Sequence, residues 1–214
     1  MQRETRHKPR PQEPWRTAKP LKNRSIRADE VSRVPHRLPP PSMPTPLTED
    51  LFKECIEQAV QKVFSTMVQK DAVPVHGASP VPSTEQWARP ADLGATVAVG
   101  NVGFVGDISG LVFIYLSENL AHVIVQSMLG MSSQEAADAG REVASDVIGE
   151  LTNMTVGTFK NRIHDLGYPC KLTIPTVVWG ADIAIQPPRG ATRRTYIFSV
   201  EGHSVIADLM FKED

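Results

Sequence analysis

The apolar residues of the chain first follow a helical pattern just after residue 47. Thr48 is suited to cap a helix, and Glu49 and Asp50 favour its first turn. The apolar positions that follow are three or four residues apart: Phe52, Cys55, Ile56, Ala59, Val60, Val63, Phe64 and Met67. This spacing predicts an amphipathic helix of about five turns.

A loop and two strands are predicted next. Residues 76–90 are rich in proline and serine, which is typical of a loop. Residues 94–117 contain two apolar, β-rich runs, ATVAV and GLVFIYL, that predict strands. This region also contains Gly100, Gly103, Gly106 and Gly110. These glycines lack the GxGxxG or GK[ST] spacing of a phosphate-binding loop, so we expect them to form hairpin turns.

Two more helices follow the strands. Ser117 is expected to cap the first, which Gly130 ends. Its apolar side is formed by Leu120, Val123, Ile124 and Met128. Ser132 and Glu135 form a capping box at the start of the second and longer helix. That helix is predicted over residues 135–166, with a break near the glycine at position 140.

The last part of the chain is β-rich. Residues 171–180 predict one strand, and Pro175 inside it indicates an edge position or a bulge. DIAIQP is a candidate short strand, and RRTYIFSV and SVIADLMF predict a hairpin joined by EGH. Arg193 and Arg194, at the start of this hairpin, are expected to meet solvent. The order of elements predicts an α+β fold, a two-layer α/β sandwich with helices on a largely antiparallel sheet.

Composition divides the chain into two parts. Residues 1–46 contain ten of the eighteen prolines, and eleven Lys and Arg against four Asp and Glu. Such a segment buries too little apolar surface to offset its ordering entropy, so we predict a disordered basic tail. Residues 47–214 contain twelve basic against twenty acidic residues and predict one acidic domain. The tail is a solvated extension, a segment preceding a true start at Met43, or an arm for membrane or nucleic acid.

Several classes of protein are disfavoured by composition. The net charge of −1 provides no strong field for nucleic acid. Cys55 and Cys170 form no CxxC or His/Cys ligand pattern, so we expect reduced thiols and no bound metal. No apolar run approaches the roughly 20 residues of a membrane span, and the N-terminus lacks the apolar core of a signal peptide. We therefore expect a cytoplasmic protein without a membrane span or nucleic-acid partner.

The long helix has an outward face of unusual composition. On a helical wheel centred on Ile148, the predicted buried stripe contains Ala144, Leu151, Thr155, Phe159, Ile163 and Leu166. Asp146, Glu150 and Asn153 lie on the opposite side, and Gly157 leaves the next turn without a side chain. Asn and Gly are weak helix formers, and two acids four residues apart repel each other. This face is either ordinary solvent-exposed surface or a surface selected for a partner.

The spacing of Asp146, Glu150, Asn153 and Pro175 resembles the motif of the CheX family of chemotaxis phosphatases, relatives of CheC and FliY. Pro175 follows Asn153 by twenty-two residues, one fewer than the family's spacing. The flanking IGELTNMTVGTFKNRI, LTIPTVVWG, VGDISGLVFIYLS and MLGM are similar to the family as well. The resemblance covers residues 50–212, and the single copy of the motif favours CheX over the CheC-like proteins, which carry two.

The resemblance implies a protein-aspartyl-phosphate phosphatase that acts on a phosphorylated CheY-type receiver domain. Asn153 would orient the attacking water, Glu150 would pair with the receiver's active-site lysine, and Asp146 and Gly157 would lie in the docking surface. The chain would bind no cofactor of its own, because the receiver supplies Mg²⁺. The resemblance also implies a homodimer formed through the sheets, with SVIADLMF as an edge.

Two other interpretations remain open at this point. The first is a receiver-binding module of the same fold that docks a receiver without hydrolysing its phosphate. The second is a tether to membrane or nucleic acid that depends on the basic tail, in which the domain is only cargo. Likeness to a family argues for its fold more strongly than for its activity.

Overall fold

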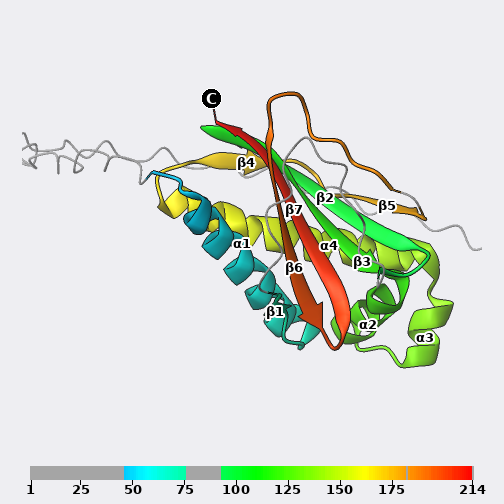
Figure 1. Ribbon diagram of the computed structural model, residues 1–214. Helices are drawn as coiled ribbons and strands as arrows, with labels where there is room; N and C mark the ends of the chain where they lie inside the picture. The colour runs from blue at the N-terminus through cyan, green and yellow to red at the C-terminus, as the bar shows by residue number, and fades with distance from the viewer. Residues whose placement is uncertain (1–45, 76–92, 182, 214) are drawn as a thin grey trace, which may run out of the picture. The chain divides into compact units, whose positions relative to one another are not determined.

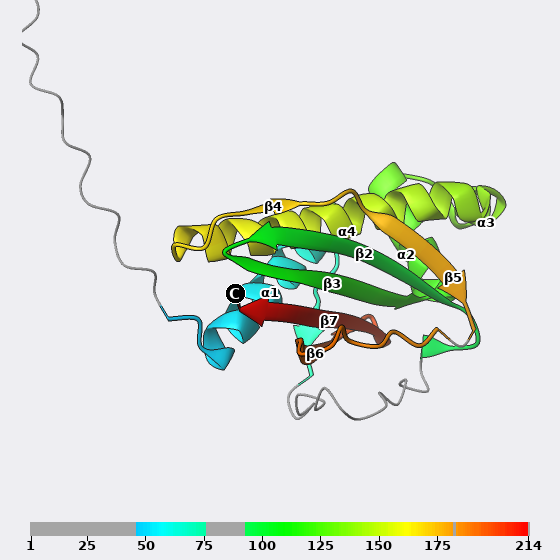
Figure 2. The same ribbon diagram turned by 90° about the horizontal axis from the view of Figure 1, so that it is seen from above.

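The structure, a computed structural model, describes residues 46–75, 93–181 and 183–213. Within these residues, helices cover one face of an antiparallel sheet (Figures 1 and 2). This is the predicted α+β sandwich, so the predicted fold class is confirmed. The predicted tail lies outside the described residues except for Pro46, and the predicted 76–90 loop lies wholly outside them.

The sheet has the strand order β1-β6-β7-β3-β2, and β4 and β5 both pair with the outer side of β2. Every pairing is antiparallel. The strands are β1 (Val73–Pro74), β2 (Val97–Gly106), β3 (Ile108–Ser117), β4 (Cys170–Leu172), β5 (Thr176–Gly180), β6 (Thr192–Val200) and β7 (His203–Glu213). The long neighbouring strands β6, β7, β3 and β2 therefore form the centre, and short strands form both edges.

The helices are α1 (Glu49–Val63), followed by the π-helix η2 (Phe64–Val68), α2 (Glu118–Leu129), α3 (Ser133–Asp138) and α4 (Gly140–Asp165). The helices α1, α2 and α3 begin at the predicted caps, and α2 ends at Gly130 as predicted. Thr48 and Ser117 accept hydrogen bonds from the amides of Leu51 and Leu120, and the capping box at Ser132 is formed. Gly140 has φ +77° and separates α3 from α4, which confirms the predicted break.

Apolar residues are buried on both faces of the sheet. On the helical face, Phe52 stacks on Phe211 with ring centroids 4.4 Å apart, and Phe104 meets Phe159 at 5.7 Å. A second cluster lies on the opposite face and contains Leu93, Val97, Val99, Phe113, Tyr115, Ile206 and Met210. Ile183 and Ile185, from the segment between β5 and β6, pack against this cluster. The strand residues therefore alternate between two apolar environments.

Several predictions about the strands are wrong. Residues 171–180 form two strands, β4 and β5, because residues 173–175 oppose only two residues of β2. The edge position or bulge that Pro175 indicated is confirmed, since both strands lie at the edge of the sheet and the register shifts by one residue between them. The described part of DIAIQP, residues 183–187, is not a strand. The SVIADLMF segment lies in β7 between β3 and β6, so it cannot serve as a sheet edge.

The predicted role of the glycines as turns also needs correction. Gly100 and Gly103 lie inside β2 and Gly110 inside β3, and only Gly106 adjoins the β2–β3 hairpin turn. A Cβ at Gly110 would overlap the Met210 carbonyl oxygen. These glycines serve mainly to allow close approach of neighbouring atoms rather than to turn the chain.

Arg193 is buried, contrary to the expectation from the sequence. Its side chain is 3% exposed and forms two hydrogen bonds to Asp208, at 2.9 and 2.6 Å. Thr195 and Tyr115 donate to the same carboxylate, and a third guanidinium nitrogen of Arg193 donates to the Ile185 carbonyl at 3.3 Å. The pair therefore links β6 and β7 to the segment that covers the outer face of the sheet.

Candidate functional site

Gly100 positions α4 on the sheet. A Cβ at Gly100 would overlap the Thr152 hydroxyl and come within 3.3 Å of the Ile148 side chain. Thr152 is fully buried, and its hydroxyl donates to the Ile148 carbonyl at 2.7 Å. Since a short buried side chain cannot rotate away, this contact sets the rotation of α4 about its axis. Glu150 and Asn153, which flank the contact along α4, are thereby directed away from β2.

The edge strand β5 holds the first half of α4 from the side. The Trp179 indole Nε1 donates to the Ser145 hydroxyl at 2.8 Å. The Arg141 guanidinium lies 5.5 Å from the centre of the Trp179 ring, a cation–π contact. These contacts join the start of α4 to the end of β5.

Two helical glycines allow the edge segment to lie close along α4 (Figure 2). The Cβ position of Gly149 is 3.7 Å from Val177 and 3.9 Å from Pro175, and that of Gly157 is 4.0 Å from Leu172. The chain from residue 172 to residue 179 thus runs antiparallel to α4. Pro175 lies beside the turn of α4 that contains Gly149.

Three of the four predicted motif residues line one shallow pocket. This pocket has a volume of about 280 Å³ and is lined by Ser145, Asp146, Gly149, Glu150, Pro175 and Val177. Asp146, Glu150 and Pro175 are exposed, whereas Asn153 is half-buried and does not line the pocket. Gly157 lies about one turn beyond Asn153 on the same helix.

The polar side chains on the outward side of α4 have no partner in the part of the chain that the structure describes. The side chains of Asp146, Glu150 and Asn153 form neither a hydrogen bond nor an ion pair there. Glu142, one turn before Asp146, is also exposed and unpaired within the same residues. Three acids at four-residue spacing repel one another weakly along the helix. The surface, which we name the α4 face (residues 142, 146, 150, 153 and 157), is therefore complementary to a basic group.

Ser145, Gly149 and Trp179 were not predicted to belong to the site. Gly149 was visible only as a weak helix former beside Glu150. Nothing in the sequence pairs Trp179 with Ser145, because that contact depends on a strand from a later part of the chain lying beside the helix.

Other reactive groups do not converge on the α4 face. Burial raises the pKa of the Cys55 and Cys170 thiols, so both are uncharged and weakly nucleophilic near neutral pH. Among residues 46–75, 93–181 and 183–213, no three His, Cys, Asp or Glu side chains are grouped to hold a metal ion. None of the helices in these ranges is long and apolar enough to cross a membrane.

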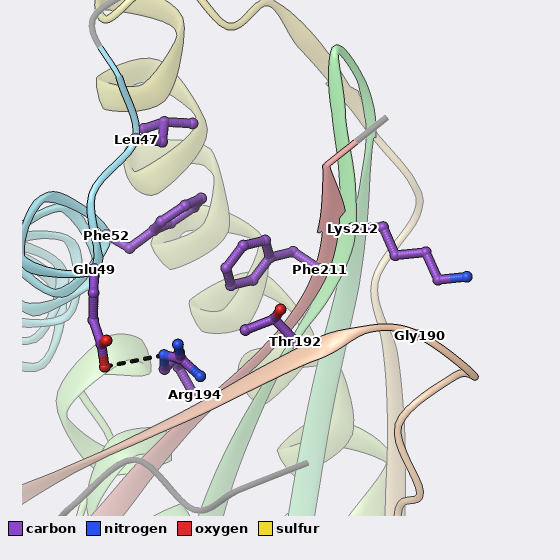
Figure 3. A pocket seen from close by; sticks show the side chains of 8 residues that line it. All are labelled: Leu47, Glu49, Phe52, Gly190, Thr192, Arg194, Phe211 and Lys212. Carbon is purple, nitrogen blue, oxygen red and sulfur yellow. Dashed lines mark ion pairs between the residues drawn. The ribbon is translucent and has the colours of Figure 1, made fainter.

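A separate cleft of about 330 Å³ lies between the start of α1 and the ends of β6 and β7 (Figure 3). Glu49 and Arg194 face each other across it and form an ion pair at 3.1 Å. Phe52 and Phe211 form its apolar wall. Arg194 is thus half-buried and paired, and this cleft shares no lining residue with the pocket of the α4 face.

Comparison with known proteins agrees with this geometry. Residues 98–199 match the family model Chemotaxis phosphatase CheX, and this range contains α4, β4 and β5. An 85-residue stretch is 35% identical to the CheY-P phosphatase CheX of Thermotoga maritima. The chain is CheX-like. This match covers 40% of the CheX-like chain and 53% of the Thermotoga protein, so it spans about half of that relative's length.

Solved structures share the fold of the CheX-like chain. A CheC-like superfamily protein from Shewanella sp. PV-4 is 25% identical, with a TM-score of 0.63 over 77% of this chain and 99% of the other. The CheX of a CheX–CheY–BeF₃–Mg²⁺ complex from Borrelia burgdorferi is 15% identical, with a TM-score of 0.54 over 76% and 98%. The sheet and helices described above are therefore those of the CheC and CheX proteins.

Proposed function

We propose that this CheX-like protein is a protein-aspartyl-phosphate phosphatase that acts on a CheY-type receiver domain. The observation that carries the proposal is the α4 face, where Glu150 and Asn153, three residues apart, present polar groups that have no partner among the described residues. The names of two similar proteins support it. One is a CheY-P phosphatase, and the other was crystallised with CheY and BeF₃, a stand-in for the phosphoryl group.

Asn153 is proposed to orient the attacking water. The water oxygen bonds to phosphorus while the bond between phosphorus and the aspartyl oxygen breaks, which leaves a carboxylate and inorganic phosphate. Phosphoryl transfer depends on positioning and on electrostatic stabilisation more than on covalent help. A carboxamide can both donate to and accept from one water, and it adds no negative charge beside the phosphate.

Glu150 is proposed to dock the receiver by pairing with its active-site lysine. Glu150 is exposed and has no cation partner among the described residues, so pairing breaks no existing contact. Asp146 lies at the rim of the same pocket, and Gly157 leaves room for the partner's backbone. Mg²⁺ belongs to the receiver in this proposal. A cytoplasmic location is part of it, and the homodimer stays a prediction.

One observation favours a second candidate function. Asn153 does not line the pocket that contains Asp146, Glu150 and Pro175. A protein that uses only that pocket would bind a receiver without positioning a water. The second candidate is therefore a receiver-binding module without catalysis.

The test measures phosphate release from a phosphorylated CheY-type receiver of the same organism. Wild type is expected to accelerate release, and Asn153→Ala to lose at least about a hundredfold of this acceleration while still binding. Glu150→Ala is expected to weaken binding. Asn161→Ala is the matched control, because Asn161 is an exposed asparagine about two turns further along α4. Binding by wild type without faster release would instead establish the docking module.

A further inference from the structure

We infer that Trp179 is a positioning residue for receiver binding, because its hydrogen bond to Ser145 holds together the two walls of the pocket on the α4 face. This pocket is the one that contains Asp146 and Glu150. The inference rests on the proposed function and deepens it. The Trp179 indole Nε1 donates to the Ser145 hydroxyl at 2.8 Å. No other hydrogen bond joins α4 to β5 in the part of the chain that the structure describes.

The two walls of the pocket come from distant parts of the chain. Ser145 and Glu150 belong to the wall formed by α4, and Pro175 and Val177 to the wall formed by β5 and the residue before it. Beside Gly149 the walls approach so closely that a Cβ there would lie 3.7 Å from Val177, an ordinary van der Waals distance. Contacts of this kind are not directional. The hydrogen bond at Ser145 is therefore the contact that fixes β5 relative to α4.

The Ser145 hydroxyl is tied on two sides. It lies 2.7 Å from the Arg141 carbonyl oxygen and 2.8 Å from the Trp179 indole nitrogen. A carbonyl can only accept a hydrogen bond and an indole N–H can only donate one. The hydroxyl therefore donates its proton to Arg141 and accepts from Trp179, so it cannot rotate without losing one of the two bonds. Through this one hydroxyl, the backbone of α4 is joined to the side chain of β5.

The strand β5 depends on this contact because it has few others. It is a five-residue strand at the edge of the sheet and pairs only with β2 among the described strands. Arg141 also lies over the Trp179 ring and pairs with Glu118 at 3.2 Å, but both members of that pair are exposed, so it stabilises little. A pocket wall that is already fixed costs less entropy when a partner binds. The hydrogen bond should therefore increase the affinity for the receiver.

Asn153 is positioned by a different contact. It directly follows Thr152, whose hydroxyl packs over Gly100 of β2 rather than against β5. Asn153 also does not line the pocket that the hydrogen bond holds. Loss of the hydrogen bond should therefore weaken docking and leave the proposed water-orienting amide in place. This separation predicts a change in KM and Kd without a change in kcat.

The experiment compares Trp179→Phe, Ser145→Ala and the double variant with wild type. Trp179→Phe removes the N–H donor and keeps an aromatic ring beside Arg141. Thr158→Val is the matched control. Its hydroxyl donates to the Met154 carbonyl at 2.9 Å, a bond of the same kind in the same helix, but Thr158 does not line the pocket.

Binding to the BeF₃-activated receiver is measured by calorimetry, and kcat and KM by phosphate release. Each single variant is expected to raise Kd and KM by about three- to tenfold with kcat unchanged, the scale for losing one hydrogen bond. The double variant should lose no more affinity than the weaker single variant, because both changes remove the same bond. Thr158→Val is expected to match wild type.

Three results would overturn the inference. Wild-type affinity in both single variants would show that the pocket keeps its shape without the hydrogen bond. A fall in kcat with unchanged Kd would show that the bond acts on Asn153 instead. Additive losses in the double variant would show that the two side chains act separately.

Failure of the proposed function gives a different result. If wild type binds the receiver without releasing phosphate, only the catalytic proposal fails, and the Kd values still confirm or overturn the role of Trp179. If wild type binds no receiver, the proposed function is refuted and the inference with it.

Discussion

The Thr152 hydroxyl of α4 lies over Gly100 of β2, in the space that a side chain at position 100 would fill. Helix and strand meet there with only the Thr152 side chain between them, and Thr152 is directly followed by Asn153. The position of the proposed catalytic residue is therefore tied to the sheet through one small contact. Changes to Gly100 should affect both stability and activity.

Gly100→Ala is expected to lower the free energy of unfolding by about 1–3 kcal/mol, because the new methyl group overpacks the contact with Thr152. Phosphate release should fall as well, since α4 must shift or rotate. Adding Thr152→Ala to the same chain removes the overlapping hydroxyl and should recover part of the stability. Urea unfolding of the three variants checks this, and unchanged stability in Gly100→Ala would show that α4 is not seated as described.

Gly157→Ala is expected to separate stability from binding. Its methyl group would meet only Leu172, at an ordinary distance of 4.0 Å, and alanine favours a helix interior by about 0.5–1 kcal/mol. The free energy of unfolding should rise while affinity for the receiver falls, because the methyl group occupies the space left for the partner. Chemical unfolding and receiver binding are measured side by side.

Gly149→Ala is the control for that variant. Gly149 is buried and its methyl group would contact both Val177 and Pro175, whereas Gly157 is only half-buried and would contact Leu172 alone. Gly149→Ala should gain similar stability with a smaller loss of affinity. Equal affinity in Gly157→Ala and wild type would remove Gly157 from the docking surface.

The buried pair of Arg193 and Asp208 should be strongly coupled. Replacing one member leaves the other charge buried without its partner, which costs about 3–5 kcal/mol of stability. We expect Arg193→Met and Asp208→Leu each to be more destabilising than the double variant. A double-mutant cycle on the free energy of unfolding measures the coupling, and additive effects would contradict it.

The capping box of α3 predicts a dependence on pH. Hydrogen bonds from the Ser132 hydroxyl and amide to the Glu135 carboxylate hold its pKa below the ordinary 4.5. Because the pKa of Glu135 is lower in the folded protein, the contact stabilises the helix at pH values above 4.5. This stabilisation is lost as the pH falls through the lowered pKa. An NMR titration should show the pKa of Glu135 rising in Ser132→Ala. The same pKa in both proteins would show that the box does not form in solution.

Local sequence patterns were sufficient to predict where most of the helices begin. Thr48, Ser117 and Ser132 cap the helices that they predict, because a cap depends on residues only three positions apart. The helical wheel of α4 correctly predicted that Asp146 and Glu150 are exposed to solvent. Asn153 is less exposed than predicted, because the edge segment that contains Leu172 and Pro175 lies beside the helix.

Contacts between distant segments could not be predicted from the sequence. Arg193 is a charged residue at a strand start, and its burial depends on Asp208 in the next strand and on the covering segment near Ile185. Gly100 looks like a turn residue until α4 is placed over it. Both errors arise because hydrophobic periodicity and secondary-structure propensity describe one helix or strand at a time, whereas tertiary packing depends on several of them together.

The interruption between β4 and β5 has a consequence for how this protein behaves at high concentration. An unpaired strand edge can recruit the edge of another molecule and so promote aggregation. Here the regular pairing is interrupted at residues 173–175, in which Thr173 still bonds to Gly103 of β2 and Pro175 has no amide hydrogen to offer. The longest uninterrupted strand on this side of the sheet is thus the five residues of β5. The same three residues therefore keep intermolecular strand pairing short.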